Sequence, residues 1–236
     1  MPHTVLALHY WAGAGREFGA LLRLLPGVEL LAPDLPGFGQ QPAPAGFDYS
    51  VRAYADWVAD YLARYAPVDF TLLGHSMGGK IALALAARRP AALRRLVLLS
   101  PSPPTPEPMP DEDRAASLAA FGNRGEAEKT LRKITQLPLS LNQQQHIVAD
   151  SLQCTRAAWD AWLTDGSRED ISALMPQLAV PCHLLVGAAD RAITSDTQRR
   201  QTLPYLPPGT PYTVVPNAGH LLPLEVPAII AALLKS

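Results

Sequence analysis

The residue with the clearest potential for chemistry is Ser76, which stands between Gly74 and Gly78 in the pattern G-x-S-x-G. The apolar run 70–73 precedes it, and an Ala- and Leu-rich helical pattern follows it. A strand that passes directly into a helix forms a tight turn, which places the serine hydroxyl at the edge of the sheet. Free N–H groups at the start of the helix would favour negative charge there. An ordinary turn serine is the alternative, but this context favours a nucleophile.

Two further residues complete a possible catalytic unit. A serine hydroxyl is a poor nucleophile at neutral pH and needs a base, usually a histidine that a carboxylate orients. Asp190 follows the expected strand 182–186, and His220 lies in the loop after the expected strand 212–215. Alone, Asp190 could be a turn aspartate and His220 merely one of the six histidines. Together with Ser76 they lie at the carboxyl ends of strands, where open parallel sheets place their sites.

These residues resemble the catalytic elements of the α/β-hydrolase superfamily. The run Gly74-His75-Ser76-Met77-Gly78-Gly79 is similar to the nucleophile elbow of that family, and the order serine, aspartate, histidine is the family's order. The resemblance implies an α/β-hydrolase fold, with a mostly parallel sheet, helices on both faces and an inserted helical lid. It also implies that Ser76, Asp190 and His220 are the catalytic residues.

The resemblance further implies an oxyanion hole formed by the backbone N–H groups of Trp11 and Met77. In the family a glycine usually precedes the first of these donors, whereas this chain has Tyr10. A tyrosine there needs an unusual φ angle or a loop that is held differently. We expect Gly13 and Gly15 to absorb the bend, so that the Trp11 N–H still faces the hole. The Tyr10 side chain would then help to shape the acyl end of the pocket.

The elements that position these residues follow from the hydrophobic pattern. Short apolar runs alternate with helical patterns in residues 1–100 and 176–236, which predicts βαβ units and a parallel sheet covered on both faces. Ser50 is expected to cap a long amphipathic helix, and Pro227 suits the first turn of the last helix. The expected strands are 4–8, 28–32, 70–73, 96–99, 182–186 and 212–215.

This alternation stops at Ser100. Six prolines in residues 101–110 indicate a stiff, extended connector. Helical patterns without strands follow at 111–121, 125–135, 142–163 and 167–174, and a further helix is expected at 196–206. We therefore predict that residues 101–175 are a helical lid inserted into a core of residues 1–100 and 176–236. Trp159 and Trp162 have helical spacing, which more often means packing than substrate binding.

Four polar residues near the expected site receive structural interpretations. His75 is expected to pack beside the turn, and Lys80 to be a solvated or capping lysine. Asp34 lies in Asp-x-Pro-Gly-x-Gly, which resembles a structural turn of the family. Glu107 is the first carboxylate after the strand that ends near residue 99, and this separation argues against a displaced catalytic acid.

The composition excludes several classes of function. With 236 residues, 48% apolar and 17% charged, the chain can build a sizeable core. The net charge of −1 gives no electrostatic case for a nucleic-acid or anionic-membrane partner. Neither an apolar run of ~18 residues nor a signal-peptide pattern is present. We expect a cytoplasmic protein with Cys154 and Cys182 reduced, and without a metal or cofactor.

Cofactor-independent hydrolysis of a small carboxylic ester, through an acyl-enzyme on Ser76, is therefore the expected function. The same triad serves thioesterases, C–C bond hydrolases, lactonases and lyases in the family, so fold and triad cannot separate them. A hydrolase-fold ligand receptor with vestigial catalysis is an alternative from a different class. Repeated turnover on simple esters would distinguish an enzyme from such a receptor. The oligomeric state is not predicted.

Overall fold

Strand β1 (His3–Leu8) shows why this chain folds around a covered sheet. Val5 and Ala7 join the hydrophobic cluster on one face of the sheet. Leu6 and Leu8 join the cluster on the other face, because successive side chains of a strand point in opposite directions. All four side chains are fully buried. A strand that is apolar on both faces requires helices on both sides of its sheet.

The computed structural model describes residues 3–235 and contains a six-stranded sheet in the order β2-β1-β3-β4-β5-β6. Every strand pair in the described part of the chain is parallel. The expected mostly parallel sheet is thus confirmed. The other strands are β2 (Val28–Leu31), β3 (Phe70–His75), β4 (Leu93–Leu99), β5 (Cys182–Gly187) and β6 (Tyr212–Val215).

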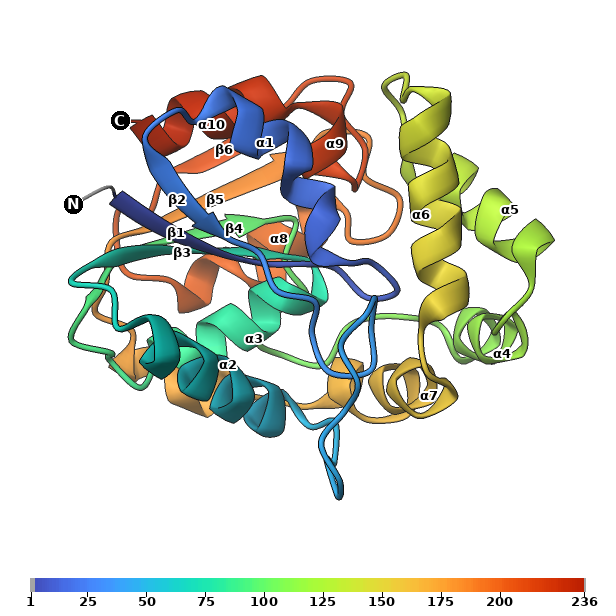
Figure 1. The fold of residues 1–236 in the computed structure, drawn as a ribbon, viewed down its shortest axis with the longest axis horizontal. Helices are drawn as coiled ribbons and strands as arrows, with labels where there is room; N and C mark the ends of the chain where they lie inside the picture. The colour runs from blue at the N-terminus through green and yellow to red at the C-terminus, as the bar shows by residue number, and fades with distance from the viewer. Residues whose placement is uncertain (1–2, 236) are drawn as a thin grey trace.

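Helices cover the two faces of this sheet as expected. Helices α1 (Gly19–Leu24) and α10 (Pro227–Lys235) lie on one face, and α2 (Val51–Tyr65) and α3 (Met77–Ala86) lie on the other (Figure 1). The Ser50 hydroxyl accepts a hydrogen bond from the Ala53 N–H at 3.0 Å, which caps α2 as predicted. The remaining short helices of the core are η1 (Gly15–Phe18), α8 (Ser195–Gln201), η4 (Leu203–Tyr205) and α9 (Leu222–Glu225).

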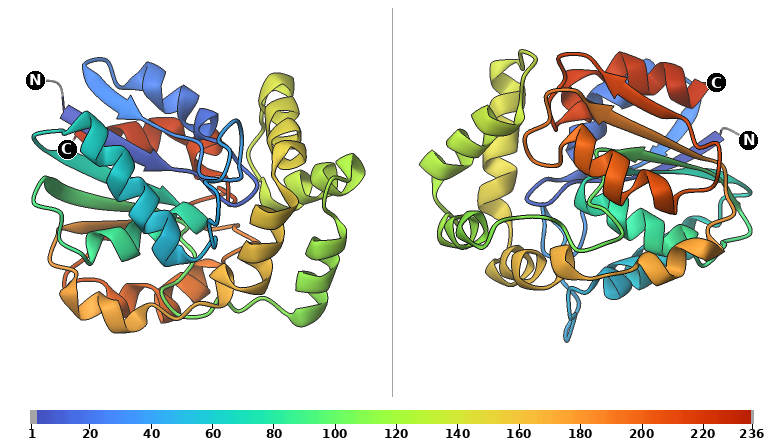
Figure 2. Two further views of the ribbon diagram at one scale, coloured as in Figure 1. Left: turned by 60° about the horizontal axis from the view of Figure 1, so that its bottom comes forward. Right: turned by 180° about the vertical axis from the view of Figure 1, so that it is seen from behind.

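The segment between β4 and β5 is helical. It contains α4 (Asp111–Ala119), α5 (Arg124–Ile134), α6 (Leu141–Gln153), α7 (Arg156–Thr164), η2 (Gly166–Arg168) and η3 (Ser172–Gln177). Figures 1 and 2 show α4 to α7 beside the edge of the sheet to which the strands run. We call residues 101–175 the helical insertion. Its role as a lid stays a prediction.

The insertion departs from the sequence prediction at Thr155. The expected continuous helix 142–163 is wrong, because the chain breaks after Gln153 and begins α7 anew. The Thr155 hydroxyl accepts a hydrogen bond from the Ala158 N–H at 3.2 Å. The backbone N–H of Thr155 donates to the Gly37 carbonyl at 2.8 Å. The break therefore lets the insertion bind a core loop. The expected helix 167–174 is divided into η2 and η3. The expected helix 196–206 is divided into α8 and η4.

Apolar side chains of the insertion pack against the core rather than facing solvent. Trp159, Trp162, Leu163 and Met175 are buried in the cluster that also holds α2 and α3, and Phe121 packs against it. Cys154 and Cys182 are buried free thiols. The insertion and the core therefore share one hydrophobic cluster.

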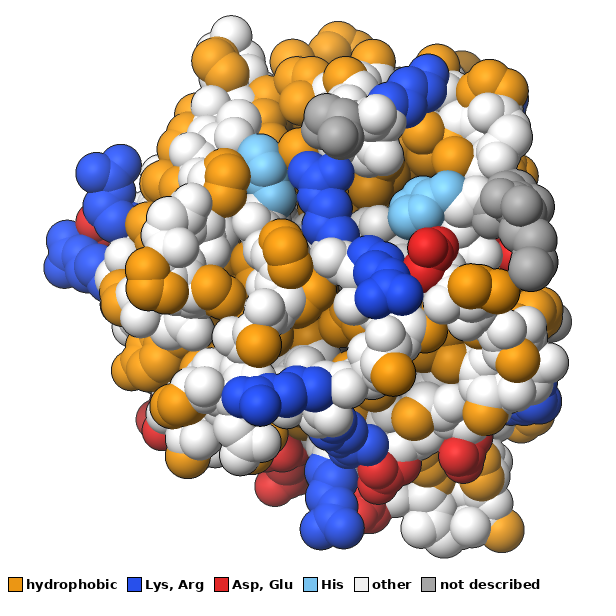
Figure 3. Space-filling view, turned by 90° about the vertical axis from the view of Figure 1, so that its left-hand side faces the viewer, with side chains coloured by type: hydrophobic (Ala, Val, Ile, Leu, Met, Phe, Trp, Pro, Cys, Tyr) orange, Lys and Arg blue, Asp and Glu red, His pale blue; other side chains and the backbone are white. Residues whose placement is uncertain are grey.

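The outer surface near the chain ends is mixed in character. Figure 3 shows acidic and basic side chains interspersed with apolar and neutral ones on this face. Such a mixture agrees with the net charge of −1. Among the described residues, no helix is long and apolar enough to span a bilayer.

The cap of α7 gives a test of how the insertion is held. Thr155→Ala should lower the free energy of unfolding by about 1 kcal/mol, because the Ala158 N–H loses its acceptor. Thr155→Ser keeps a hydroxyl and is the matched control. Urea unfolding measures both variants. Equal stability of the alanine variant and wild type would contradict this role of Thr155.

Candidate active site

Ser76 occupies a strained turn between β3 and α3. Its φ of 51° and ψ of −117° lie in a region that costs about 1–3 kcal/mol for a residue with a side chain. The Ser76 N–H donates to the Leu99 carbonyl at 3.0 Å. The Ser76 carbonyl accepts from the N–H groups of Gly79 at 2.8 Å and Ser102 at 2.9 Å. Strand β4 and the connector that follows it thus hold the strained backbone in place.

The two glycines that flank the motif are required by close packing. A Cβ on Gly78 would lie 2.3 Å from the Leu8 carbonyl oxygen of β1. A Cβ on Gly74 would lie 2.7 Å from the Gly78 carbonyl oxygen. Both contacts are with backbone, which cannot move aside as a flexible side chain can. The spacing of the motif therefore reflects the approach of α3 to two neighbouring strands.

Asp190 and His220 meet as a buried pair. Asp190 Oδ2 lies 2.8 Å from His220 Nδ1, and the two residues are 4% and 3% exposed. The other oxygen, Oδ1, accepts hydrogen bonds from the N–H groups of Ala192 at 2.8 Å and Ile193 at 3.0 Å. A carboxylate facing Nδ1 assigns the proton of a neutral ring to that nitrogen. His220 Nε2 is then left free to accept a proton.

The charges of this pair shift both pKa values. Burial alone would raise the pKa of Asp190, but the charge and hydrogen bond of His220 and the Ile193 N–H lower it overall. Burial alone would lower the pKa of His220, but the Asp190 charge and hydrogen bond raise it overall. Asp190 is therefore ionised near neutral pH and stabilises the protonated form of His220.

His75 connects the Ser76 turn to the His220 loop. His75 Nε2 lies 2.9 Å from the His220 carbonyl oxygen, and the two rings are 5.2 Å apart. Ser76, Asp190 and His220 follow the ends of β3, β5 and β6 on the same edge of the sheet. In the described chain no hydrogen bond joins Ser76 Oγ to His220, and such bonds often tighten only when substrate binds. The structure thus brings the three residues to one edge.

The loop after β1 bends at a residue that the sequence analysis did not indicate. The positive φ, 64°, belongs to Ala12, whereas Gly13 and Gly15 have no positive φ, so the expectation that they absorb the bend is wrong. These glycines instead allow close packing. A Cβ on Gly13 would lie 2.3 Å from the Tyr10 ring, and one on Gly15 would lie 1.9 Å from the Ala32 carbonyl oxygen. Tyr10 therefore needs no unusual φ.

The two backbone N–H groups expected to form the oxyanion hole have no hydrogen-bond acceptor in the described chain. Among residues 3–235, neither the Trp11 N–H nor the Met77 N–H donates a hydrogen bond. The loop and the turn are tied together, since the Gly78 N–H donates to the His9 carbonyl at 3.1 Å. Preorganised, unpaired donors of this kind are what an oxyanion requires. Their assignment to an oxyanion hole stays a prediction.

Comparison with known proteins identifies the family. A model described as the alpha/beta hydrolase family matches residues 5–233. The chain belongs to the α/β-hydrolase family. The hydrolase is 30% identical to a pimeloyl-[acyl-carrier protein] methyl ester esterase from Neisseria meningitidis serogroup C, over 98% of this chain and 91% of that protein. It is also 30% identical to a 2-succinyl-6-hydroxy-2,4-cyclohexadiene-1-carboxylate synthase from Enterobacter sp. (strain 638), over 96% of this chain and 88% of that protein.

Solved structures share the fold of the hydrolase at lower identity. A bromoperoxidase from Bacillus anthracis superposes with a TM-score of 0.90 at 16% identity, covering 100% of this chain and 93% of that one. An esterase from Exiguobacterium antarcticum superposes with a TM-score of 0.87 at 20% identity, covering 99% and 90%, respectively. At such identities the likeness shows the fold alone.

Lys80 of the hydrolase is buried, so its interpretation as a solvated lysine is wrong. The residue is fully buried, and its Nζ donates to the carbonyl oxygens of Thr105 at 3.2 Å and Ser167 at 3.4 Å. Burial lowers its pKa to about 8, although the charge of Glu107 opposes the shift. Every residue of α3 is buried, and its all-round apolar pattern is the signal that could have indicated a buried lysine.

Glu107 also lies closer to the site than the sequence indicated. Its Oε2 accepts a hydrogen bond from the Ser102 hydroxyl at 2.8 Å, and the Ser102 N–H binds the Ser76 carbonyl. Burial raises the pKa of Glu107, while Ser102, Lys80 and His220 lower it in part. Asp190, not Glu107, contacts His220, so Glu107 is no displaced acid. Among residues 3–235, no group of three or more His, Cys, Asp or Glu could hold a metal ion.

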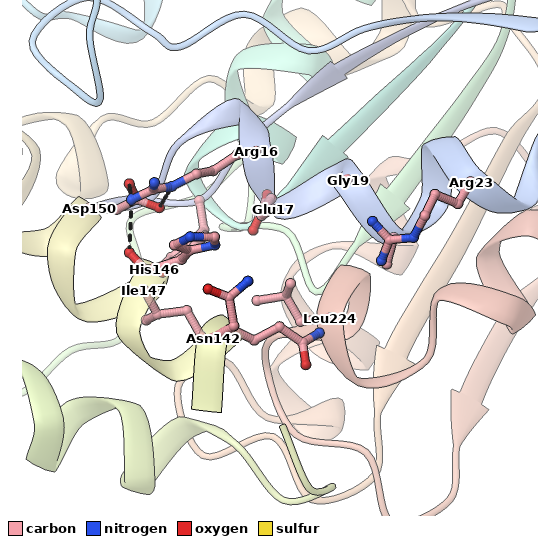
Figure 4. Close-up of a pocket in the computed structure, with 12 residues that line it drawn as sticks. Arg16, Glu17, Gly19, Arg23, Asn142, His146, Ile147, Asp150 and Leu224 are labelled. Carbon is pink, nitrogen blue, oxygen red and sulfur yellow. Dashed lines mark hydrogen bonds and ion pairs between the residues drawn. The ribbon is translucent and has the colours of Figure 1, made fainter. Parts of the chain in front are cut away.

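A cavity of about 190 Å³ separates η1 and α1 from α6 of the insertion. Arg16 crosses it and pairs with Asp150 of α6 (Figure 4). Glu17 and Tyr10 also line the cavity, but Ser76, Asp190 and His220 do not. Tyr10 packs with Leu131, Ile147, Val148 and Leu221 between the insertion and the core. The expectation that Tyr10 helps to shape the acyl end of the substrate pocket remains a prediction.

The buried Lys80 gives a pH-dependent prediction. Its pKa of about 8 lies below its ordinary value of 10.5, so between these values the unfolded chain holds more protons on this lysine. The lysine's contribution to stability therefore rises as pH rises through this window. We expect wild type to gain free energy of unfolding relative to Lys80→Met between pH 8 and 10.

Urea unfolding at several pH values measures this difference. Lys133→Met, which removes an exposed lysine of α5, is the matched control and should show no such trend. A constant difference between wild type and Lys80→Met across the window would contradict the shifted pKa of Lys80.

Proposed function

We propose that this protein is a serine esterase that cleaves a small carboxylic ester through an acyl-enzyme on Ser76. The observation that carries the proposal is the buried Asp190–His220 hydrogen bond of 2.8 Å at the sheet edge where Ser76 occupies its strained turn. Relatives named as methyl ester esterases support ester cleavage as the reaction. Those relatives also favour an acyl ester as the substrate.

In the proposed reaction, Ser76 Oγ attacks the ester carbonyl while His220 Nε2 takes its proton. Asp190 keeps the ring oriented and stabilises the imidazolium that forms. The carbonyl oxygen becomes negative and is bound by the N–H groups of Trp11 and Met77. The C–O bond to the alcohol breaks as His220 returns the proton to the leaving oxygen. Water, deprotonated by His220, then releases the carboxylic acid from Ser76.

A second candidate follows from the relative named as a synthase. The same His220 could abstract a proton from a substrate carbon, without an acyl bond to Ser76. The discriminating property is the acyl-enzyme, which an esterase forms and such a synthase-type reaction does not. Thioesterase, C–C bond hydrolase and lactonase activities share the Ser76 mechanism and are separated only by substrate panels.

Ser76→Ala tests the nucleophile. We expect a fluorophosphonate probe to label wild type at Ser76 and to leave the variant unlabelled, and ester turnover to fall by ~10³-fold or more. Ser151→Ala, on α6, is the matched control and should label as wild type does. Turnover of the Ser76→Ala protein at the wild-type rate would refute the mechanism. A single stoichiometric burst in wild type would favour the receptor alternative.

The pKa of His220 gives a second test. His220 must be neutral to take a proton, so kcat/KM should fall as pH falls through its raised pKa, above the ordinary 6.5. Asp190→Asn removes the charge that raises this pKa, so the acid limb of the profile should move to lower pH. The substitution should also lower kcat/KM itself. The measurement is a pH–rate profile on an ester whose chemical step limits the rate. An acid limb at the same pH in both proteins would exclude His220 as the titrating base.

A further inference from the structure

The pair formed by His75 and Glu17 lies beside the proposed catalytic residues but has no part in their chemistry. His75 Nδ1 lies 3.1 Å from both carboxylate oxygens of Glu17. His75 Nε2 lies 2.9 Å from the His220 carbonyl oxygen. His75 is fully buried and Glu17 is 4% exposed, so water does not replace these contacts. Figure 4 shows Glu17 projecting from η1 among the residues that line the cavity.

The number of protons on His75 follows from its partners. A backbone carbonyl can only accept a hydrogen bond, so Nε2 must carry a proton. An ionised carboxylate also only accepts, so Nδ1 must carry a proton as well. The alternative is a protonated Glu17 that donates to a bare Nδ1. The equal distances of 3.1 Å from Nδ1 to the two oxygens fit one N–H shared by an ionised carboxylate, and this geometry favours the ion pair.

We propose that His75 is an imidazolium paired with the Glu17 carboxylate, and that this buried ion pair positions His220 for catalysis. A buried charge is tolerated only when it is paired and hydrogen-bonded, and the three contacts meet that condition. The two residues are positioning residues, since they act through His220. This role rests on the proposed function, whereas the charge state does not.

The pair acts on the carbonyl side of His220, where the Leu222 N–H also donates to the carbonyl oxygen at 2.9 Å. Asp190 fixes the His220 ring, and the His220 N–H donates to the Ile134 carbonyl of α5 at 2.8 Å. The His220 carbonyl is bound by His75, which immediately precedes Ser76. A charged N–H donor forms a stronger hydrogen bond than a neutral one. The imidazolium therefore ties the backbone of the base to the turn that carries the nucleophile.

The charge state can be measured without any substrate. We expect ¹⁵N NMR of histidine-labelled protein at neutral pH to show both ring nitrogens of His75 protonated, with the signal assigned by its loss in His75→Gln. In Glu17→Gln the side-chain amide can donate to Nδ1, so His75 should become neutral with Nε2 still protonated. A wild-type His75 with one bare nitrogen would overturn the proposed ion pair.

The positioning role is measured by comparing matched variants. Glu17→Gln preserves a partner for Nδ1 but removes the charge, so kcat should fall, by up to about fivefold. Glu17→Leu leaves Nδ1 without a partner and should lower kcat by ~10–100-fold while KM changes less than threefold. Similarly, His75→Gln can still donate to the His220 carbonyl and should retain more kcat than His75→Leu. His183→Gln, at the start of β5, is the control for loss of a histidine and should leave kcat unchanged.

The outcomes separate this inference from the proposed esterase function. Ser76 labelling by fluorophosphonate together with a neutral wild-type His75 would overturn the ion pair and leave the esterase proposal standing. A doubly protonated His75 without Ser76 labelling would reject the esterase proposal and keep the ion pair. Equal kcat values for Glu17→Leu, Glu17→Gln and wild type would overturn the positioning role. Circular dichroism and urea unfolding establish that each variant is folded before its kinetics are compared.

Discussion

The close approach of β3 and α3 is the constraint on which the rest of the site depends. The turn between them can exist only because Gly74 and Gly78 leave room for neighbouring backbone, at 2.7 and 2.3 Å from where their Cβ atoms would be. That packing forces Ser76 into a φ of 51°, which the hydrogen bonds from β4 and the connector keep in place. A strained conformation held from several sides is rigid, and rigidity suits the proposed role of Ser76 as a nucleophile, which relies on position.

The second half of the site depends on the helical insertion. The His220 N–H binds the Ile134 carbonyl, and Glu225 accepts hydrogen bonds from the backbone of Gln136 and Leu137 as well as Gly219. The segment after α5 is thus bound to the loop that carries the proposed base. A movement of α5 would therefore strain these hydrogen bonds. The insertion is therefore mechanically linked to His220 as well as being adjacent to it.

Local sequence pattern predicted the strands, the covering helices and the placement of Ser76, Asp190 and His220 at one sheet edge, because each depends on residues close in the chain. It failed where the partner is remote. Glu17 lies 58 positions from His75, and Ser167 lies 87 positions from Lys80. The residues next to Lys80 in the sequence do not indicate that the distant carbonyl groups of Thr105 and Ser167 accept its hydrogen bonds. The bend at Ala12 escaped prediction because glycine, not alanine, is the usual residue at positive φ.

The fold and the proposed triad do not by themselves define a substrate. Ser76 is only 9% exposed. The ring of Trp11 lies 4.2 Å from the ring of Trp159 of α7, at an interplanar angle of 49°, so the insertion contacts the proposed oxyanion loop. Relatives named as an esterase and as a synthase match the chain at the same 30% identity, so the fold accommodates both. What distinguishes their substrates must then come from side chains outside the sheet edge that carries Ser76, Asp190 and His220.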